Sequence, residues 1–252
     1  VDGRKLRLKQ QYFLVSATLQ WILREFETRN GGNWSLLPEK IVIHINDTHP
    51  TMAIPEMMRL LMDEKGLGWD EAWGIVTRVF AYTNHTVLSE ALEKWPVDMF
   101  REVVPRIYMI VDEMNKRLMD RLEAFYPGDN AKHKYMAIIS DNQVYMANIC
   151  LASCFAVNGV SKLHTQILKN DIFADYYRMN PESFHAITNG ITFRRWIANC
   201  NPELTRLISS KIGTGWIKDS KTLSGIAKYA KDPVFQKEFD KIKRDNKVHL
   251  AE

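Results

Sequence analysis

Polar side chains follow two apolar segments of the chain, and their chemical types suit recognition of a neutral sugar. Asp47, Thr48 and His49 follow the β-branched segment 41–45 after Asn46, and residues 83–86 (Thr-Asn-His-Thr) lie at the end of a second apolar segment. Short carboxylate, hydroxyl, amide and imidazole groups donate and accept hydrogen bonds with fixed geometry, as a polyol requires, whereas an anion would call for arginines and glycines. The pattern therefore predicts a sugar pocket where the two segments end.

The elements that would position these side chains are two buried strands joined by helices. Segments 41–45 and 79–83 have the β-branched and aromatic composition of strands. Between them, one helix is expected from Pro55 until the glycines at 66–68, and a second over 70–78. Strand, helix, strand order predicts an α/β fold with a parallel sheet, in which ligands collect at the carboxyl ends of the strands.

Helices are expected to dominate the rest of the chain. Apolar residues at helical spacing predict helices over 8–27, 97–125 with a break near Pro105, 145–168 with an interruption at Asn158-Gly159, 201–208, and 233–250. The residues Tyr126 to Asp129 (Tyr-Pro-Gly-Asp) predict a turn.

Each candidate residue also has an alternative interpretation without function. Asp47 fits an Asx turn or a helix cap, and His49 fits a turn residue before proline. His44 alternates within its strand and fits a histidine satisfied in the core. The glycines of Asn158-Gly159 and Asn189-Gly190 fit helix ends or turns of any protein. Composition and periodicity do not decide between these interpretations.

Composition places the chain among folded, water-soluble proteins. It has 252 residues, 46% hydrophobic and 25% charged, with a net charge of +4. The longest apolar stretch, about 149–157, is much shorter than the roughly 20 residues that cross a bilayer, so no membrane span is expected. Much of the positive charge lies between Lys218 and Lys247 with acidic residues interspersed, which indicates a solvated helix face and not a nucleic-acid surface.

The cysteines indicate neither an extracellular scaffold nor a metal site. Cys150, Cys154 and Cys200 are odd in number, and neither a Cys-x-x-Cys nor a His-x-x-x-His pair occurs. We expect structural cysteines in the core, no metal, and a cytoplasmic protein.

Four separated blocks resemble the α-glucan phosphorylases, the family of glycogen and maltodextrin phosphorylases. They are Leu6 to Phe13, Asn46 to Glu56 with its Asn-Asp-Thr-His-Pro start, Ala81 to Pro96, and the pair Ala156 to Val160 and Thr188 to Thr192. Their order and spacing also match, and the similarity runs along nearly the whole chain. The chain is therefore identified as similar to an internal stretch of this family.

The resemblance implies a helix-rich part of a two-domain, Rossmann-like glycosyltransferase of the GT-B type. Residues 1–189 would be the C-terminal part of the N-terminal glucan-binding domain, and 190–252 would begin the C-terminal cofactor-binding domain. The reaction implied is cleavage of a terminal α-1,4 bond of glycogen or maltodextrin by inorganic phosphate, giving α-glucose 1-phosphate with retained configuration. Pyridoxal phosphate would lie in the cleft between the domains of the full-length protein, which would be a homodimer.

The resemblance also implies roles for individual residues. His85 is similar to the family histidine that contacts the glucosyl unit, Asn189 to the asparagine that binds a hydroxyl of the same sugar, and Asp47 would orient His85. Substrate-binding roles are implied for Arg7, His49, Thr86, Ala91 and Val160. Trp196 is similar to a residue packed near the cofactor, although its sequence context also fits a simple hydrophobic anchor with a basic rim.

Several expectations concern what the chain lacks. Val1 is not an initiator Met and opens no leader-like pattern, so we expect a cut end. The family's cofactor lysine, in a Gly-Thr-Gly-Asn-Met-Lys context, would lie downstream of Glu252, so the fragment is expected to bind no pyridoxal phosphate and to be inactive. Phe193 and Ser89 stand where the family commonly has proline, which affects loop rigidity more than chemistry.

Two other functions remain open. A nucleotide-sugar glucosyltransferase has a similar architecture, although four ordered phosphorylase blocks argue against it. A catalytically dead glucan-binding or regulatory homologue would keep the sugar pocket but lack the cofactor lysine. The preferred glucan and any allosteric control are left undecided.

Overall fold

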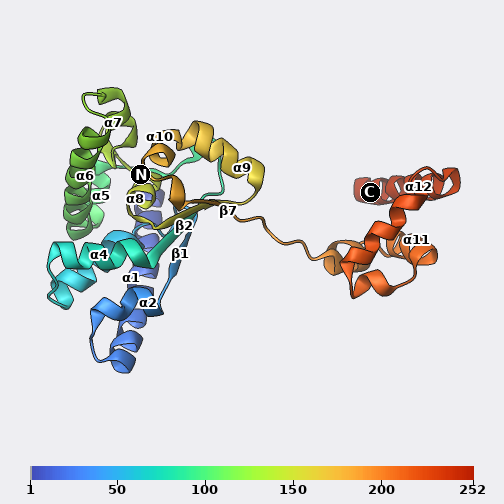
Figure 1. The fold of residues 1–252 in the computed structure, drawn as a ribbon, viewed down its shortest axis with the longest axis horizontal. Coiled ribbons are helices and arrows are strands. Elements are labelled where there is room, and N and C mark those ends of the chain that lie inside the picture. Colours follow the sequence, from blue (N-terminus) through green and yellow to red (C-terminus); the bar gives the residue numbers. More distant parts are fainter. Residues whose placement is uncertain (1) are drawn as a thin grey trace. The chain divides into compact units, whose positions relative to one another are not determined.

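The computed structural model describes residues 2–252, and the chain divides into two compact units, Val1–Asn189 and Gly190–Glu252 (Figure 1). Residues 187–192 have neither helical nor strand conformation.

The first unit is built on a four-stranded parallel sheet. Its strands are β1 (Ile43–Asn46), β2 (Phe80–Thr83), β6 (Ala156–Gly159) and β7 (Phe184–Ala186), in the order β1-β2-β6-β7. The predicted strands 41–45 and 79–83 are β1 and β2, and they are neighbours with Asn46 paired to Thr83. The α/β class with a parallel sheet is thus confirmed.

Helices surround this sheet in Figure 1. They are α1 (Asp2–Asn30), α2 (Leu37–Lys40), α3 (Ala53–Arg59), α4 (Trp69–Val79), α5 (Val97–Val103), α6 (Pro105–Phe125), α7 (Asn130–Met136), α8 (Met146–Ser153), α9 (Lys162–Ile167) and α10 (Ala174–Met179). The predicted break near Pro105 is correct, because proline lacks the N–H that an unbroken helix needs and Val104 leaves helical geometry.

The prediction of a helical stretch over 145–168 is wrong at its centre. Strand β6 lies between α8 and α9 and pairs with β2 on one side and β7 on the other. A short apolar run buried within a sheet has no polar alternation, so its pattern does not distinguish a strand from a buried helix. The interruption at Asn158-Gly159 is the end of this strand.

A second, antiparallel sheet was not predicted. It contains β3 (Lys94–Pro96), β4 (Ile139–Ser140) and β5 (Gln143–Tyr145), in the order β3-β5-β4. Asp141 and Asn142 join β4 to β5 with φ of 47° and 56°, the left-handed conformation that a two-residue hairpin turn requires. Strands of two or three residues leave too little pattern in the sequence to detect.

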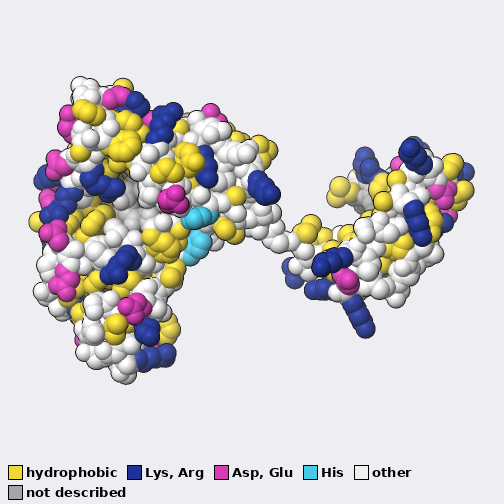
Figure 2. Space-filling model, viewed as in Figure 1, with side chains coloured by type: hydrophobic (Ala, Val, Ile, Leu, Met, Phe, Trp, Pro, Cys, Tyr) yellow, Lys and Arg dark blue, Asp and Glu magenta, His cyan; other side chains and the backbone are white. Residues whose placement is uncertain are grey.

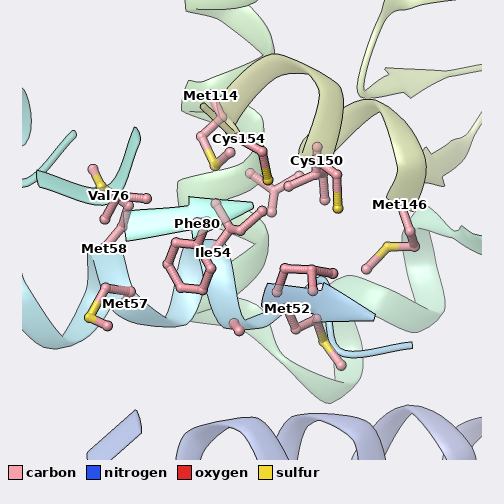
Figure 3. Packing of buried hydrophobic residues seen from close by; sticks show 14 of the residues in the cluster. Met52, Ile54, Met57, Met58, Val76, Phe80, Met114, Met146, Cys150 and Cys154 are labelled. Carbon is pink, nitrogen blue, oxygen red and sulfur yellow. The ribbon is translucent and has the colours of Figure 1, made fainter. Parts of the chain in front are cut away.

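The core of the first unit is rich in sulfur-containing and aliphatic side chains. Figure 3 shows side chains of α3, α4, α6 and α8 packed around Phe80 of β2, which is fully buried. Cys150 and Cys154 belong to this core, whereas Cys200 is exposed, so the expectation of core cysteines is wrong for Cys200.

The second unit is helical. A π-helical turn (Arg194–Asn199) leads to α11 (Pro202–Ile212), two 3₁₀ segments (Gly215–Ile217 and Ser220–Tyr229), and α12 (Pro233–Ala251). Asn201 and Asp232 cap α11 and α12 through side-chain oxygens that accept backbone N–H groups. Both helices were predicted. Across residues 2–252, no helix is long and apolar enough to cross a membrane.

Candidate active site

The loops that follow β1, β2 and β6 are held together by continuation of the sheet hydrogen bonds. The Asp47 N–H donates to the Thr83 carbonyl at 3.0 Å, and the Asn84 N–H donates to the Asn158 carbonyl at 3.0 Å. The polar residues expected at these strand ends therefore lie on one edge of the sheet, as parallel strands require. Figure 2 shows histidine side chains at the surface of the first unit, beside an acidic side chain.

A cleft of about 530 Å³ lies next to this edge. Five residues assigned to the sugar site by resemblance line it together: Arg7, Asp47, His49, Thr86 and Ala91. They come from α1, from the loop after β1 and from the segment after β2. The lining also includes residues that were not assigned a role, namely Arg4, Thr48, Glu90, Leu92, Glu93, Lys94 and Trp95.

Asp47 has a left-handed backbone, with φ of 63°. This conformation is costly for most residues but is accepted by Asp and Asn, whose short polar side chains bond locally. Its carboxylate Oδ1 accepts the Thr48 N–H at 2.6 Å. Asp47 thus forms a local turn and also lines the cleft, so the two interpretations of this residue are compatible.

His85 is exposed, and its Nε2 lies 2.6 Å from Oδ1 of Asn46. The expectation that Asp47 orients His85 is therefore corrected, because the observed partner is Asn46, the last residue of β1. The Asp47 carboxylate is turned to its own neighbour by the left-handed backbone. Since an amide oxygen only accepts, Nε2 of His85 carries the proton and donates to Asn46.

A buried network lies behind the His85 loop. Asn84 is fully buried; its Nδ2 donates to the Tyr82 hydroxyl at 3.1 Å and its Oδ1 accepts the Thr86 N–H at 3.1 Å. The same Oδ1 lies 3.2 Å from Nε2 of His164, and Nδ1 of His164 accepts the Val160 N–H at 3.1 Å.

His164 was not identified from the sequence. A single histidine in a short helix of mixed composition carries no signal, and its partner Asn84 is distant in the chain. Burial lowers the pKa of His164, the nearby charge of His85 lowers it further, and a backbone hydrogen bond of Thr86 opposes both effects.

A second line of hydrogen bonds crosses the strands. Nε2 of His44 lies 2.5 Å from the Thr83 hydroxyl, which donates to Oδ1 of Asn158 at 2.7 Å. His44 is exposed, so the interpretation as a core histidine is wrong, although its ring is bonded. Asn158 donates to the Gly159 carbonyl at 3.2 Å. These bonds tie β1, β2 and β6 at their carboxyl ends.

Glu93 and Trp95 add polar atoms at the cleft. Oε1 of Glu93 accepts Gln11 Nε2 at 3.0 Å and pairs with Arg7 Nε at 3.4 Å. Within the part of the chain that the structure describes, Oε2 of Glu93 and Nε1 of Trp95 are buried without a hydrogen-bond partner. Arg7 is therefore held in the lining by a carboxylate, and its long stem reaches the cleft from α1.

The remaining predicted residues, His85 among them, lie outside the described lining of this cleft. Val160 is half-buried after β6, and its N–H is used by His164. Asn189 is exposed at the end of the first unit. Trp196 belongs to the second unit, where 61% of its side chain is exposed.

Trp196 by itself does not make a site for pyridoxal phosphate. That cofactor needs a lysine amine for its aldehyde, and such an amine is normally held at a lowered pKa. Trp196 carries an indole ring and no amine, so its presence alone does not fit the cofactor.

Comparison with known proteins decides the family. A family model described as carbohydrate phosphorylase matches residues 1–252. The chain belongs to the carbohydrate phosphorylase family. Among curated phosphorylases, the muscle form of glycogen phosphorylase from Oryctolagus cuniculus is 43% identical over 260 residues, and the liver form from Homo sapiens is 42% identical over 261.

These matches cover 99% and 100% of the chain but 31% of each phosphorylase, so the chain spans about a third of the length of these relatives. The resemblance seen in the four sequence blocks is thus a family membership that extends along the whole chain.

Proposed function

We propose that this chain forms the glucosyl-binding wall of an α-glucan phosphorylase. The protein that contains it would use inorganic phosphate to cleave terminal α-1,4 bonds of glycogen or maltodextrin and release α-glucose 1-phosphate with retained configuration. One observation carries the proposal: Arg7, Asp47, His49, Thr86 and Ala91, assigned from the family pattern, line a single cleft, and His85 directly precedes Thr86 in the chain.

The chemistry of the cleft suits this substrate. Asp47 and His49 offer a carboxylate acceptor and an imidazole, and Thr86 offers a hydroxyl that both donates and accepts, so the donors and acceptors of sugar hydroxyls would both be matched. Arg7 is paired with Glu93, which reduces its attraction for anions at this wall. His85 would meet the sugar through the ring edge that Asn46 does not occupy.

The domain roles follow the same proposal. Residues 1–189 would belong to the glucan-binding domain and residues 190–252 to the start of the cofactor-binding domain. Asn189 and Val160 would contact the glucosyl unit, and Trp196 would lie near pyridoxal phosphate. The complete protein would bind that cofactor through further residues, act in the cytoplasm and form a homodimer.

The direct test uses the complete protein that carries this chain. Incubated with maltoheptaose and inorganic phosphate, it should release glucose 1-phosphate, and omission of phosphate should stop the release. His85→Ala should reduce turnover by about a hundredfold or more if the ring contacts the reacting sugar. Undiminished turnover of this variant would refute the role of His85.

Two outcomes would favour the other functions. Transfer of glucose from UDP-glucose to glycogen, without phosphorolysis, would indicate a nucleotide-sugar glucosyltransferase. Binding of maltoheptaose with neither reaction would indicate a glucan-binding homologue. Either outcome contradicts the proposal.

We also propose that the 252-residue chain alone binds no pyridoxal phosphate and has no phosphorylase activity. Reconstitution with the cofactor should leave its absorption spectrum equal to that of the free aldehyde. A shifted band that survives dialysis and is fixed by borohydride would show an imine in this chain and contradict the proposal.

A further inference from the structure

The two ring nitrogens of His164 have different hydrogen-bonding roles, one as an acceptor and one as a donor. Nδ1 accepts the Val160 N–H at 3.1 Å, so it must carry the lone pair. Nε2 lies 3.2 Å from Oδ1 of Asn84. With Nδ1 occupied as an acceptor, the neutral ring has its proton on Nε2 and donates it to Asn84. Only this tautomer satisfies both contacts.

The orientation of the Asn84 amide is determined by the same contacts. Its oxygen accepts from Thr86 and from His164, and its nitrogen donates to the Tyr82 hydroxyl. A flipped amide would set its NH₂ group against two donors. Because Asn84 is fully buried, unsatisfied donors would be costly, so the flip is excluded.

The backbone of Thr86 is therefore anchored by a buried side chain. Its N–H reaches Asn84, and its side chain lines the cleft, while His85 stands between these two residues. His164 is itself fixed on α9, where its N–H donates to the Ser161 hydroxyl at 3.0 Å. The chain of contacts runs from α9 through Asn84 to the loop that carries His85 and Thr86.

We infer that His164 is a positioning residue for the sugar-binding loop 84–86, acting through Asn84 in its Nε2-protonated tautomer. It does not touch the substrate; it determines where His85 and Thr86 stand. This inference rests on the proposed function for its kinetic readout, because the loop positions catalytic groups only if the cleft binds the reacting sugar.

Two substitutions to amide side chains test the two contacts of His164 one at a time. In His164→Gln the side-chain amide nitrogen can take the place of Nε2 and donate to Asn84. In His164→Asn the shorter side chain reaches only the place of Nδ1, where its oxygen can accept from Val160, and the contact to Asn84 is lost. His133→Asn is the control, since His133 is also buried but bonds the Tyr126 carbonyl from α7.

The expected result in the complete protein is a loss of phosphorolysis in one variant only. His164→Asn should lower kcat/KM for maltoheptaose by about tenfold or more, chiefly in kcat, because misplacement of catalytic groups weakens transition-state contacts. His164→Gln and His133→Asn should stay within about threefold of the unmodified protein. Equal losses in His164→Gln and His164→Asn would overturn the inference, as would unchanged kinetics in both.

A measurement without substrate keeps the test independent of activity and of variant folding. The ¹⁵N chemical shifts of His164 at neutral pH should show a protonated Nε2 and an unprotonated Nδ1. The opposite tautomer, or an imidazolium ring, would overturn the inference even in an inactive protein. If phosphorolysis is absent but this tautomer is found and Thr86 amide exchange is faster in His164→Asn than in His164→Gln, the proposed function fails while the positioning role stands.

Discussion

At the scale of single residues, backbone conformation determines which hydrogen bonds a side chain of the site can make. Asp47 is the clearest case, because its left-handed backbone directs its carboxylate to the Thr48 N–H. The same residue lines the cleft, so a substitution there changes both the turn and the surface of the cleft. The two effects can be separated by the choice of replacement.

We predict that Asp47→Gly is more stable than Asp47→Ala by about 1 kcal/mol, because a Cβ disfavours the left-handed region and glycine does not. Asp47→Asn should be close to the unmodified chain in stability, since Asn accepts this conformation and keeps an acceptor oxygen for Thr48. Urea unfolding of the three variants measures the differences. Equal stability of the Gly and Ala variants would show that the backbone of Asp47 is not left-handed in solution.

The pH dependence of stability should reveal His164. Its folded-state pKa is lowered by burial and by the charge of His85, so the neutral ring contributes stability above the unfolded pKa of about 6.5. That contribution is lost as the pH falls, because the unfolded chain binds the proton more readily. Relative to His164→Gln, which does not titrate, the unmodified chain should therefore lose stability below this pH.

The free energies of unfolding of the unmodified chain and of His164→Gln, measured between pH 5 and pH 8, test this predicted loss of stability. The other histidines are common to both chains and cancel in the difference. Parallel curves would contradict the prediction, and so would an unmodified chain that gains stability relative to His164→Gln as the pH falls.

At the scale of elements, the close approach of β6 to α9 keeps His164 in reach of Asn84. A Cβ built on Gly159 would lie 2.5 Å from the Thr165 hydroxyl and 3.0 Å from the Thr165 N. The second atom is backbone and cannot rotate away, so α9 would have to move. Only glycine permits the strand and the helix to stay at their present separation.

We predict that Gly159→Ala destabilises the first unit by about 1–3 kcal/mol, the usual cost of overpacking. Gly74→Ala is the matched control, because Gly74 lies within α4 with nothing near its Cβ position, and alanine should stabilise that helix by about 0.5–1 kcal/mol. Thermal or urea unfolding of both variants shows whether each substitution stabilises or destabilises the protein. A neutral Gly159→Ala would mean that α9 adjusts without loss.

The elements also show what a sequence pattern can and cannot predict. Strands β1 and β2 have β-branched or aromatic runs ending in polar residues, so both strands and their shared edge were predictable. Strand β6 was not, because four residues buried between two neighbours have no alternation. The cleft residues were grouped by family pattern, but the contacts of Asn46, Asn84 and His164 join positions 39 and 80 residues apart in sequence, which no local periodicity encodes.

At the scale of the whole chain, the division into two units has a consequence for proteolysis. The segment 187–192 has no helix or strand, and Ile187 and Ile191 are 59% and 78% exposed. Its described backbone bonds lie at its ends, from the Ile187 N–H to Gly159 and at the Thr192 carbonyl. The loop at 86–91 also has exposed apolar residues, but hydrogen bonds within it hold its backbone, including Leu88 N–H to the Thr86 hydroxyl.

A protease binds its substrate in an extended conformation, so the first cut should fall where the backbone can leave the structure without breaking an element. We therefore predict that brief thermolysin treatment cleaves the chain before Ile187 or Ile191 and yields two products that resist further cleavage, one for each unit. Mass spectrometry of the early products identifies the bond. A first cut within 86–91 would instead show that the segment after β2 opens more readily than the segment between the units, and it would weaken the case that Asn84 and His164 anchor the loop 84–86.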